Sequence, residues 1–192
     1  MSLHLRSLIP VHRSALEARR DVAEDERAEP SRANGGGGGD GEGRRQKILA
    51  VASGGGHWVQ LLRMLPAFDG QEIVYVTTLP SYRQFVAPAR FYTVCDANLW
   101  TKLRLVRMAA KICWVLLRER PDVVISTGAA CGYFALRAGR WVGASTIWVD
   151  SIANVEKLSL SGRKVGPYAD LWLTQWPHLA RPEGPRYEGA VL

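Results

Sequence analysis

A short loop near residue 55 combines residue types that suit the binding of an anion. A run of apolar residues ends at Ala52, and the chain continues as Ser53, Gly54, Gly55, Gly56 and His57. Glycine lets the backbone approach a ligand closely, and the free N–H groups at the start of a helix attract phosphate. An imidazole beside such a loop can act as a general base or bind a phosphate oxygen. The same residue types also fit a tight turn with a capping histidine, so both interpretations stay open.

Two further loops with polar or glycine residues follow predicted strands. One carries Thr127 and Gly128, and the other carries Asp150, Ser151 and Asn154. Ligands of open parallel sheets bind beyond the carboxyl ends of the strands, so we expect the three loops to lie together. Asp150 is thus a second candidate general base, although a carboxylate in this place can also cap the following turn.

The elements that must position these loops alternate along the chain. Short Val- and Ile-rich runs predict strands over residues 47–52, 72–78, 91–95, 122–127, 144–150 and 170–174. Helical patterns fill most of the gaps, at residues 57–68, 99–119 and about 131–142. Near-continuous apolar strands separated by helices are typical of a parallel sheet covered on both faces. The sequence therefore predicts a single α/β domain with a doubly wound, Rossmann-like sheet and a long polar loop after Asp150.

The first 46 residues differ in composition from the rest of the chain. They are rich in charge, Gly and Ser, and they hold eight Arg against eight Asp or Glu. Such a stretch cannot bury enough apolar surface to fold, so residues 1–46 are predicted to be a disordered tail and residues 47–192 the folded domain. The whole net charge of +7 therefore falls on the domain. A basic domain suggests an anionic partner such as phosphate, a membrane surface or nucleic acid, although no nucleic-acid module is recognisable.

Several classes of site are not indicated. The cysteines at positions 95, 113 and 131 lie far apart and include no CxxC pair, which argues against a zinc site. The chain has no GxGxxG motif, and its second predicted strand ends in Thr77 and Thr78 rather than in an acidic residue. We therefore predict neither a metal nor a cofactor. There is also no signal-peptide pattern and no apolar run of about 18 residues, so we expect neither secretion nor a membrane span.

The predicted helix over residues 99–119 carries its cations on one side. At about 100° per residue, one narrow stripe holds Arg104, Arg107, Lys111 and Arg118. We expect the apolar side chains beside that stripe to be Leu103, Met108, Trp114 and Val115, with Val106, Ala109, Cys113 and Leu117 facing elsewhere. Such a helix can lie on a membrane surface with its cations on lipid phosphates. An ordinary packed helix with a solvated basic face is the alternative.

Three separated motifs together resemble a known family. They read "VASGGGHWVQLLRM" from residue 51, "DSIANVEKLSLSGR" from residue 150 and "LTQWPHLA" from residue 173. The chain is similar to the anchoring subunits of two-subunit glycosyltransferases. These include the PssD-type proteins of bacterial polysaccharide assembly, to which the likeness is nearest. They also include the anchoring subunit of the N-acetylglucosaminyltransferase that adds the second sugar of eukaryotic lipid-linked N-glycans.

The resemblance implies a fold, a partner and a substrate. It implies the N-terminal half of a GT-B glycosyltransferase such as MurG, with a PssE-like partner chain that binds the UDP-sugar donor. The loops at 54–57 and 128–132 would then face a polyprenyl-diphosphate-linked sugar, with His57 where the acceptor hydroxyl meets the donor. We expect a peripheral place on the cytoplasmic face of the inner membrane. A scaffold that recruits a catalytic partner without doing chemistry is the alternative function. One departure is that the eukaryotic subunit carries an N-terminal membrane helix, whereas residues 1–46 here are polar.

Overall fold

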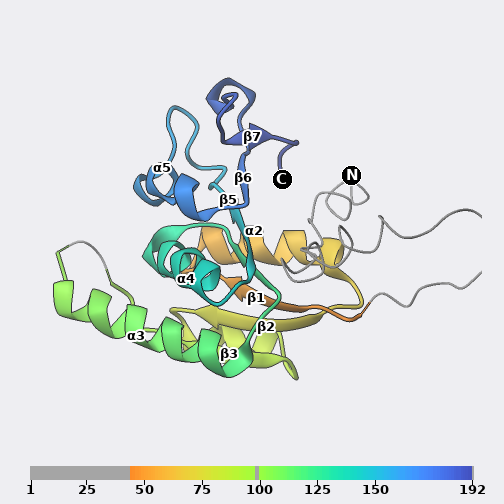
Figure 1. The fold of residues 1–192 in the computed structure, drawn as a ribbon, viewed down its shortest axis with the longest axis vertical. Helices are drawn as coiled ribbons and strands as arrows, with labels where there is room; N and C mark the ends of the chain where they lie inside the picture. Colours follow the sequence, from red (N-terminus) through yellow and green to blue (C-terminus); the bar gives the residue numbers. More distant parts are fainter. Residues whose placement is uncertain (1–43, 98–99, 192) are drawn as a thin grey trace, which may run out of the picture. The chain divides into compact units, whose positions relative to one another are not determined.

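One parallel sheet organises the computed structural model, which describes residues 44–97 and 100–191 (Figure 1). Within these residues seven strands pair in the order β3-β2-β1-β4-β5-β6-β7, and every pair is parallel. The strands are β1 Lys47–Val51, β2 Glu72–Thr77, β3 Arg90–Thr93, β4 Val123–Ser126, β5 Ser145–Val149, β6 Leu171–Thr174 and β7 Arg186–Tyr187. The α-helices are α2 Gly56–Met64, α3 Lys102–Glu119, α4 Ala129–Trp141 and α5 Leu160–Val165. The predicted doubly wound, Rossmann-like sheet is confirmed.

The central strands are buried on both faces, which is why their sequences are continuously apolar. In β1 successive side chains point to opposite faces, so Ile48 and Ala50 join one core and Leu49 and Val51 join the other. The first core is closed by α2 and the short 3-10 helix η2 Leu65–Phe68. The second core is closed by α3 and α4. Two cores of this kind hold the carboxyl ends of the strands, and the loops that follow them, at fixed positions.

The element boundaries differ from the sequence prediction where local chemistry intervenes. The helix expected over 57–68 ends at Met64 and continues as η2, because Pro66 has no N–H to donate to the preceding turn. The predicted long loop after Asp150 contains α5, which Ser159 caps by accepting a 2.7 Å hydrogen bond from the Gly162 N–H. A six-residue helix shows too little periodicity to be read from sequence. Strand β7 is also new; it is only two residues long.

Helix α3 presents a different face to the core from the one predicted. It begins at Lys102, and residue 99 lies outside the described residues. Met108 and Val115 are buried rather than placed beside the cations, whereas Val106 and Leu117 are each 65% exposed. The reason is that apolar residues occur on both sides of this helix, and the core takes the side that also carries Ile112, Leu116 and Glu119. The cations Arg104, Arg107, Lys111 and Arg118 are all exposed, as predicted.

Two sequence-based expectations concern segments that the structure describes only in part. Of the tail predicted at 1–46, only residues 44–46 are described; the rest lies outside the described residues, so its disorder stays a prediction. Among the helices of the described residues, none has the length and apolar character needed to cross a membrane.

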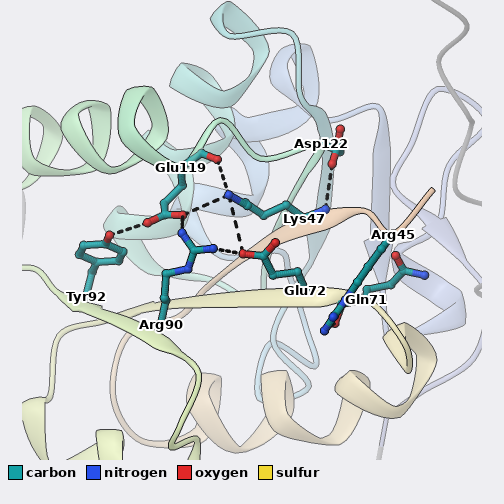
Figure 2. Close-up of polar contacts among 8 residues, drawn as sticks. All are labelled: Arg45, Lys47, Gln71, Glu72, Arg90, Tyr92, Glu119 and Asp122. Carbon is teal, nitrogen blue, oxygen red and sulfur yellow. Dashed lines mark hydrogen bonds and ion pairs between the residues drawn. The ribbon is translucent and has the colours of Figure 1, made fainter.

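The amino-terminal edge of the sheet is held by a buried carboxylate. Glu119, at the end of α3, is 3% exposed and accepts hydrogen bonds from Arg90 at 2.7 Å, Tyr92 at 2.5 Å and Lys47 at 3.4 Å (Figure 2). Arg90 also pairs with Glu72. Burial, together with the hydrogen bond to Glu119, raises the pKa of Tyr92. The cluster joins β1, β2, β3 and α3, and it supplies the partners that a buried charge requires.

Replacing Glu119 with alanine should therefore destabilise the domain. We expect Glu119→Ala to lower the free energy of unfolding by about 2–4 kcal/mol, because a positive pair loses its counter-charge. The lower end allows for Arg90, whose side chain is 53% exposed. Urea unfolding measures the change, with Glu183→Ala as an exposed control. Equal stability of the two variants would contradict a structural role for the cluster.

Candidate functional site

The three loops singled out in the sequence leave the carboxyl edge of neighbouring strands. Strand β1 pairs with β2 on one side and with β4 on the other, and β4 pairs with β5. The strands that follow β1 thus extend the sheet in one direction and those from β4 onward in the other (Figure 1). Such a reversal of strand order is where open α/β sheets bind their ligands. The expected convergence of the loops after β1, β4 and β5 is what this topology provides.

His57 and Thr127 join the first two loops by reciprocal hydrogen bonds. His57, in the first turn of α2, places Nδ1 2.9 Å from the carbonyl oxygen of Thr127. The Thr127 hydroxyl donates in return to the carbonyl oxygen of His57 at 2.7 Å. Because a carbonyl oxygen only accepts, Nδ1 carries the proton, and in the neutral imidazole Nε2 keeps its lone pair. The contact therefore selects the tautomer in which Nε2 can take a proton from a substrate.

Gly128 is required beside this ring. A Cβ atom at this position would lie 2.4 Å from His57 Cε1 and 2.5 Å from Nδ1, and the residue has φ of +143°. The next residue, Ala129, has φ of +66° although it is not a glycine. A left-handed conformation of this kind costs about 1–3 kcal/mol, and such strain concentrates at functional sites. The first residues of α4 are thus held in an unfavourable backbone conformation next to the imidazole.

The glycine loop itself offers fewer free donors than its composition suggests. The Gly54 N–H donates to Thr78 Oγ1 at 3.1 Å, and the Gly55 N–H donates to the Tyr82 hydroxyl at 3.0 Å. The N–H groups of Gly56 and His57, at the start of α2, have no hydrogen-bond acceptor among the described residues. They are the donors that an anion can use.

The glycine positions of the loop differ in how much room they leave for a side chain. A Cβ atom at Gly54 would approach Leu79 Cδ1 to 2.6 Å, whereas nothing lies within 4 Å of such an atom at Gly55 or Gly56. Ser53 lies at the start of the loop, with its hydroxyl 3.5 Å from the carbonyl oxygen of Gly54. Anion binding by the loop as a whole stays a prediction.

Asp150 follows β5, and both of its carboxylate oxygens accept hydrogen bonds. It is 1% exposed, and the hydroxyl and the N–H of Ser159 donate to it at 2.7 Å and 2.9 Å. Asn154 Nδ2 donates at 3.4 Å. A Cβ atom at Gly162 would lie 2.6 Å from Asp150 Oδ1, so α5 approaches the carboxylate closely. The observed contacts shape the 151–162 segment; proton transfer by Asp150 stays a prediction.

Two glutamines, which sequence analysis did not single out, hold the backbone at this place. Gln60 and Gln175 are buried, and their Nε2 atoms donate to the carbonyl oxygen of Asp150 at 3.3 Å and 2.9 Å. Gln60 lies one turn after His57 on α2, so one helix carries both the imidazole and a brace for the third loop. Ser151, also buried, accepts a hydrogen bond from the Ala153 N–H at 3.3 Å. The signal in the sequence was a polar residue on the apolar side of the helix, between Trp58 and Leu61.

Comparison with known proteins finds relatives in one family. A family model described as "Oligosaccharide biosynthesis protein Alg14 like" matches residues 79–191. The chain is 38% identical over 69 residues to the UDP-N-acetylglucosamine transferase subunit ALG14 of Yarrowia lipolytica, covering 33% of this chain and 32% of that protein. It is 40% identical over 67 residues to the corresponding subunit of Schizosaccharomyces pombe, covering 31% of each. The chain thus spans about a third of the length of the curated relatives it matches.

Solved structures share the fold at low sequence identity. MurG of Acinetobacter baumannii superposes with a TM-score of 0.62 and 11% identity, covering 76% of this chain and 45% of that one. A UDP-N-acetylglucosamine 2-epimerase from Rickettsia bellii superposes with a TM-score of 0.59 and 14% identity, covering 77% and 46%. The domain therefore has the fold of somewhat less than half of each of these larger chains.

The packing of His57 on Gly128 can be tested with a matched pair of glycines. Gly143 also has positive φ, +81°, but nothing lies within 4 Å of an added Cβ. We expect Gly128→Ala to lower the free energy of unfolding by about 1–3 kcal/mol more than Gly143→Ala, because only the former overpacks the ring. Nitrogen NMR should show the Nδ1–H tautomer of His57 in Gly143→Ala and its loss in Gly128→Ala. An unchanged tautomer in both variants would contradict the assigned contact.

Proposed function

The chain belongs to the family of Alg14-like oligosaccharide biosynthesis proteins, and on that premise we propose that it is the acceptor-binding subunit of a two-chain glycosyltransferase. The reaction we propose is transfer of a sugar from a UDP-sugar to a polyprenyl-diphosphate-linked sugar during polysaccharide assembly. The donor would be bound by a PssE-like partner chain. Family membership agrees with the resemblance seen in the three sequence motifs.

Two findings support a division of labour between two chains. The curated relatives are named as subunits of a UDP-N-acetylglucosamine transferase. The fold corresponds to 45% of the MurG chain, and we propose that a partner chain supplies the counterpart of the rest. In GT-B enzymes the two domains face each other across a cleft, and the carboxyl edge of this sheet, with His57 on it, is the edge that a partner domain would face.

The observation that carries the proposal is the 2.9 Å contact of His57 Nδ1 with the Thr127 carbonyl oxygen, which directs Nε2 to accept a proton, beside the start of α2. The N–H groups of Gly56 and His57 would bind a phosphate of the acceptor. The acceptor hydroxyl would then lie near Nε2, which removes its proton as the oxygen attacks the anomeric carbon of the donor. The bond from that carbon to the diphosphate oxygen breaks, UDP leaves with the electron pair, and the configuration at the carbon inverts. No other chemical group is needed for the balance of this step.

Asp150 supports the same site in a positioning role. Its carboxylate fixes Ser159 and Asn154, and its carbonyl oxygen is tied to Gln60 of α2. The loop after β5 is thereby held against the helix that carries His57. We propose that Ser151 and Asn154 lie beside the acceptor, as predicted from the sequence, and that Thr127 and Gly128 hold the imidazole. We accordingly assign proton transfer to His57.

The exposed face of α3 supports peripheral attachment to the inner membrane from its cytoplasmic side. At about 100° per residue, its exposed apolar residues form a stripe opposite the core face: Leu103, Val106, Ala110, Trp114 and Leu117. The cations Arg107, Lys111 and Arg118 lie directly beside it. Lys111 Nζ is 4.3 Å and Arg118 Cζ 5.5 Å from the centre of the Trp114 ring. A tryptophan with cations at its edge suits the headgroup region of a bilayer.

Removal of the imidazole tests the catalytic assignment. In membranes that contain this chain and its partner, we expect His57→Ala to lower sugar transfer at least about tenfold, as expected when a general base is lost. His178→Ala is the matched control, because His178 lies in none of the three candidate loops. Its ring contacts the Val155 carbonyl oxygen, and its centroid lies 6.0 Å from that of the Trp176 ring. Copurification with the partner should be equal for both variants.

The same assay separates the proposal from a scaffold. Unchanged transfer by His57→Ala, with partner binding intact, would sink the base assignment and favour a subunit that only recruits its partner. Transfer by this chain without any partner would overturn the proposed division between donor and acceptor chains.

Membrane contact by α3 is tested with vesicles. At about 1 kcal/mol per cation on an anionic surface, Arg107→Gln with Lys111→Gln should weaken binding to phosphatidylglycerol-containing vesicles roughly thirtyfold. Arg63→Gln with Arg83→Gln removes the same charge from other exposed positions and should have little effect. Val106→Ser with Leu117→Ser should weaken binding at every salt concentration.

Equal loss of vesicle binding in both double-glutamine variants would mean that net charge, not the α3 surface, governs attachment. If all variants kept full binding, the exposed face of α3 would be reassigned to a protein partner.

A further inference from the structure

An apolar pocket opens beside the candidate site, and we infer that it holds the first isoprenoid units of a prenyl-diphosphate ligand, with Lys164 at its mouth contacting the diphosphate. The inference rests on the proposed function, since it names the part of the acceptor that the pocket receives. The pocket has a volume of about 410 Å³, within the range of roughly 300–1,000 Å³ that is usual for ligand sites.

The walls of the pocket are apolar and come from three separate segments. Trp100 and Leu105 stand at the start of α3, Tyr133 and Phe134 on the first turns of α4, and Leu160 on α5. The rings of Tyr133 and Phe134 pack edge to face on the α4 wall, with their centroids 5.5 Å apart and an interplanar angle of 72°. A branched, unsaturated hydrocarbon gains from a site of this kind by leaving water, whereas a sugar would leave its hydroxyls without partners there.

Two of these walls directly follow residues of the candidate site in the chain. Helix α4 begins directly after Gly128, on which the His57 ring packs. Helix α5 begins at the residue after Ser159, which is bound to Asp150. A ligand in the pocket would therefore lie near the starts of these two helices. A diphosphate attached to the hydrocarbon would lie toward those helix starts.

One cation stands at the mouth of the pocket. Lys164 lines the pocket, yet its side chain is exposed, so its ammonium group belongs to the mouth rather than to the apolar interior. It takes part in none of the ion pairs seen among the described residues. A mobile lysine is a suitable partner for a phosphate as a point charge. Charge at the rim and apolar walls within match an amphiphile with an anionic head.

The pocket opens next to an exposed aromatic side chain. Trp100, on the pocket wall, is 93% exposed. Leu105, the wall residue on α3, is only partly exposed and lies on the side of the helix away from the stripe that we propose to touch the membrane. An isoprenoid longer than the pocket would therefore leave it past Trp100.

Binding of small probes to the full-length chain tests the inference. Isothermal titration would compare inorganic diphosphate, farnesyl diphosphate, farnesol and the straight-chain alcohol dodecanol. We expect farnesyl diphosphate to bind at least about tenfold more tightly than inorganic diphosphate. Ser161→Trp, which fills the pocket from α5, and Leu160→Ser, which shortens an exposed wall, should reduce that advantage without changing the affinity for inorganic diphosphate. Val142→Ser, at an exposed site at the far end of α4, should leave it intact.

The lysine is tested in the same way. Lys164→Gln should weaken binding of farnesyl diphosphate several-fold and leave farnesol unchanged. Arg163→Gln, an exposed neighbour that does not line the pocket, should change neither.

The other possible results of the titrations separate the pocket assignment from the proposed acceptor role. If farnesyl diphosphate binds no better than inorganic diphosphate, the pocket assignment is wrong and the proposed acceptor role stands. If neither diphosphate binds, the acceptor role fails and the pocket assignment falls with it. If dodecanol binds as tightly as farnesol, the pocket is a general lipid groove and the isoprenoid assignment is overturned.

Discussion

The reciprocal hydrogen bonds between His57 and Thr127 join the two halves of the sheet at the point where its strand order reverses. Strands β1 and β4 already pair along their length, and these hydrogen bonds add a contact between the loops that follow them. The contact fixes the tautomer of the imidazole as well as the distance between the loops. Gly128 is the condition for both, because any side chain there would occupy the place of the ring.

Buried carboxylates have different roles at the two edges of the sheet. At the amino edge Glu119 accepts hydrogen bonds from Arg90, Tyr92 and Lys47. At the carboxyl edge Asp150 is satisfied from below by the loop that it organises. At the same edge, Nε2 of His57 and the first N–H groups of α2 remain available to a ligand. The polar groups of the amino edge thus bind one another, whereas some of those at the carboxyl edge remain available for binding.

Helices α3, α4 and α5 carry the surfaces that are proposed to contact lipid. The core uses one face of α3, and its opposite face carries both apolar and cationic side chains. The apolar pocket is separate from that exposed face; it is lined by Trp100 and Leu105 near the start of α3 and by residues of α4 and α5. For a subunit proposed to bind a lipid-linked acceptor, the pocket and the loops beside it would bind hydrocarbon and diphosphate on adjoining surfaces of different polarity.

The sequence by itself determined the central architecture and the place of the site. Continuous Val- and Ile-rich runs can only be buried strands, and strands alternating with helices make a parallel sheet, so the loops after residues 52, 126 and 149 had to share an edge. Family membership, too, was readable from three motifs. These features depend on local composition and on the order of the elements along the chain.

The tertiary structure decided which hydrogen-bonding groups of these loops remain available and which face of α3 is exposed. The amides of Gly54 and Gly55 are used by Thr78 and Tyr82, more than twenty residues away, and the glycine run gave no sign of it. Gln60 and Gln175 reach the carbonyl oxygen of Asp150 from distant parts of the chain in the same way. In α3 both sides are apolar enough to be buried, and only contact with the sheet selected Met108 and Val115 over Val106 and Leu117. Hydrogen-bond partners and helix facing are set by residues distant in sequence, whereas periodicity reports only on near neighbours.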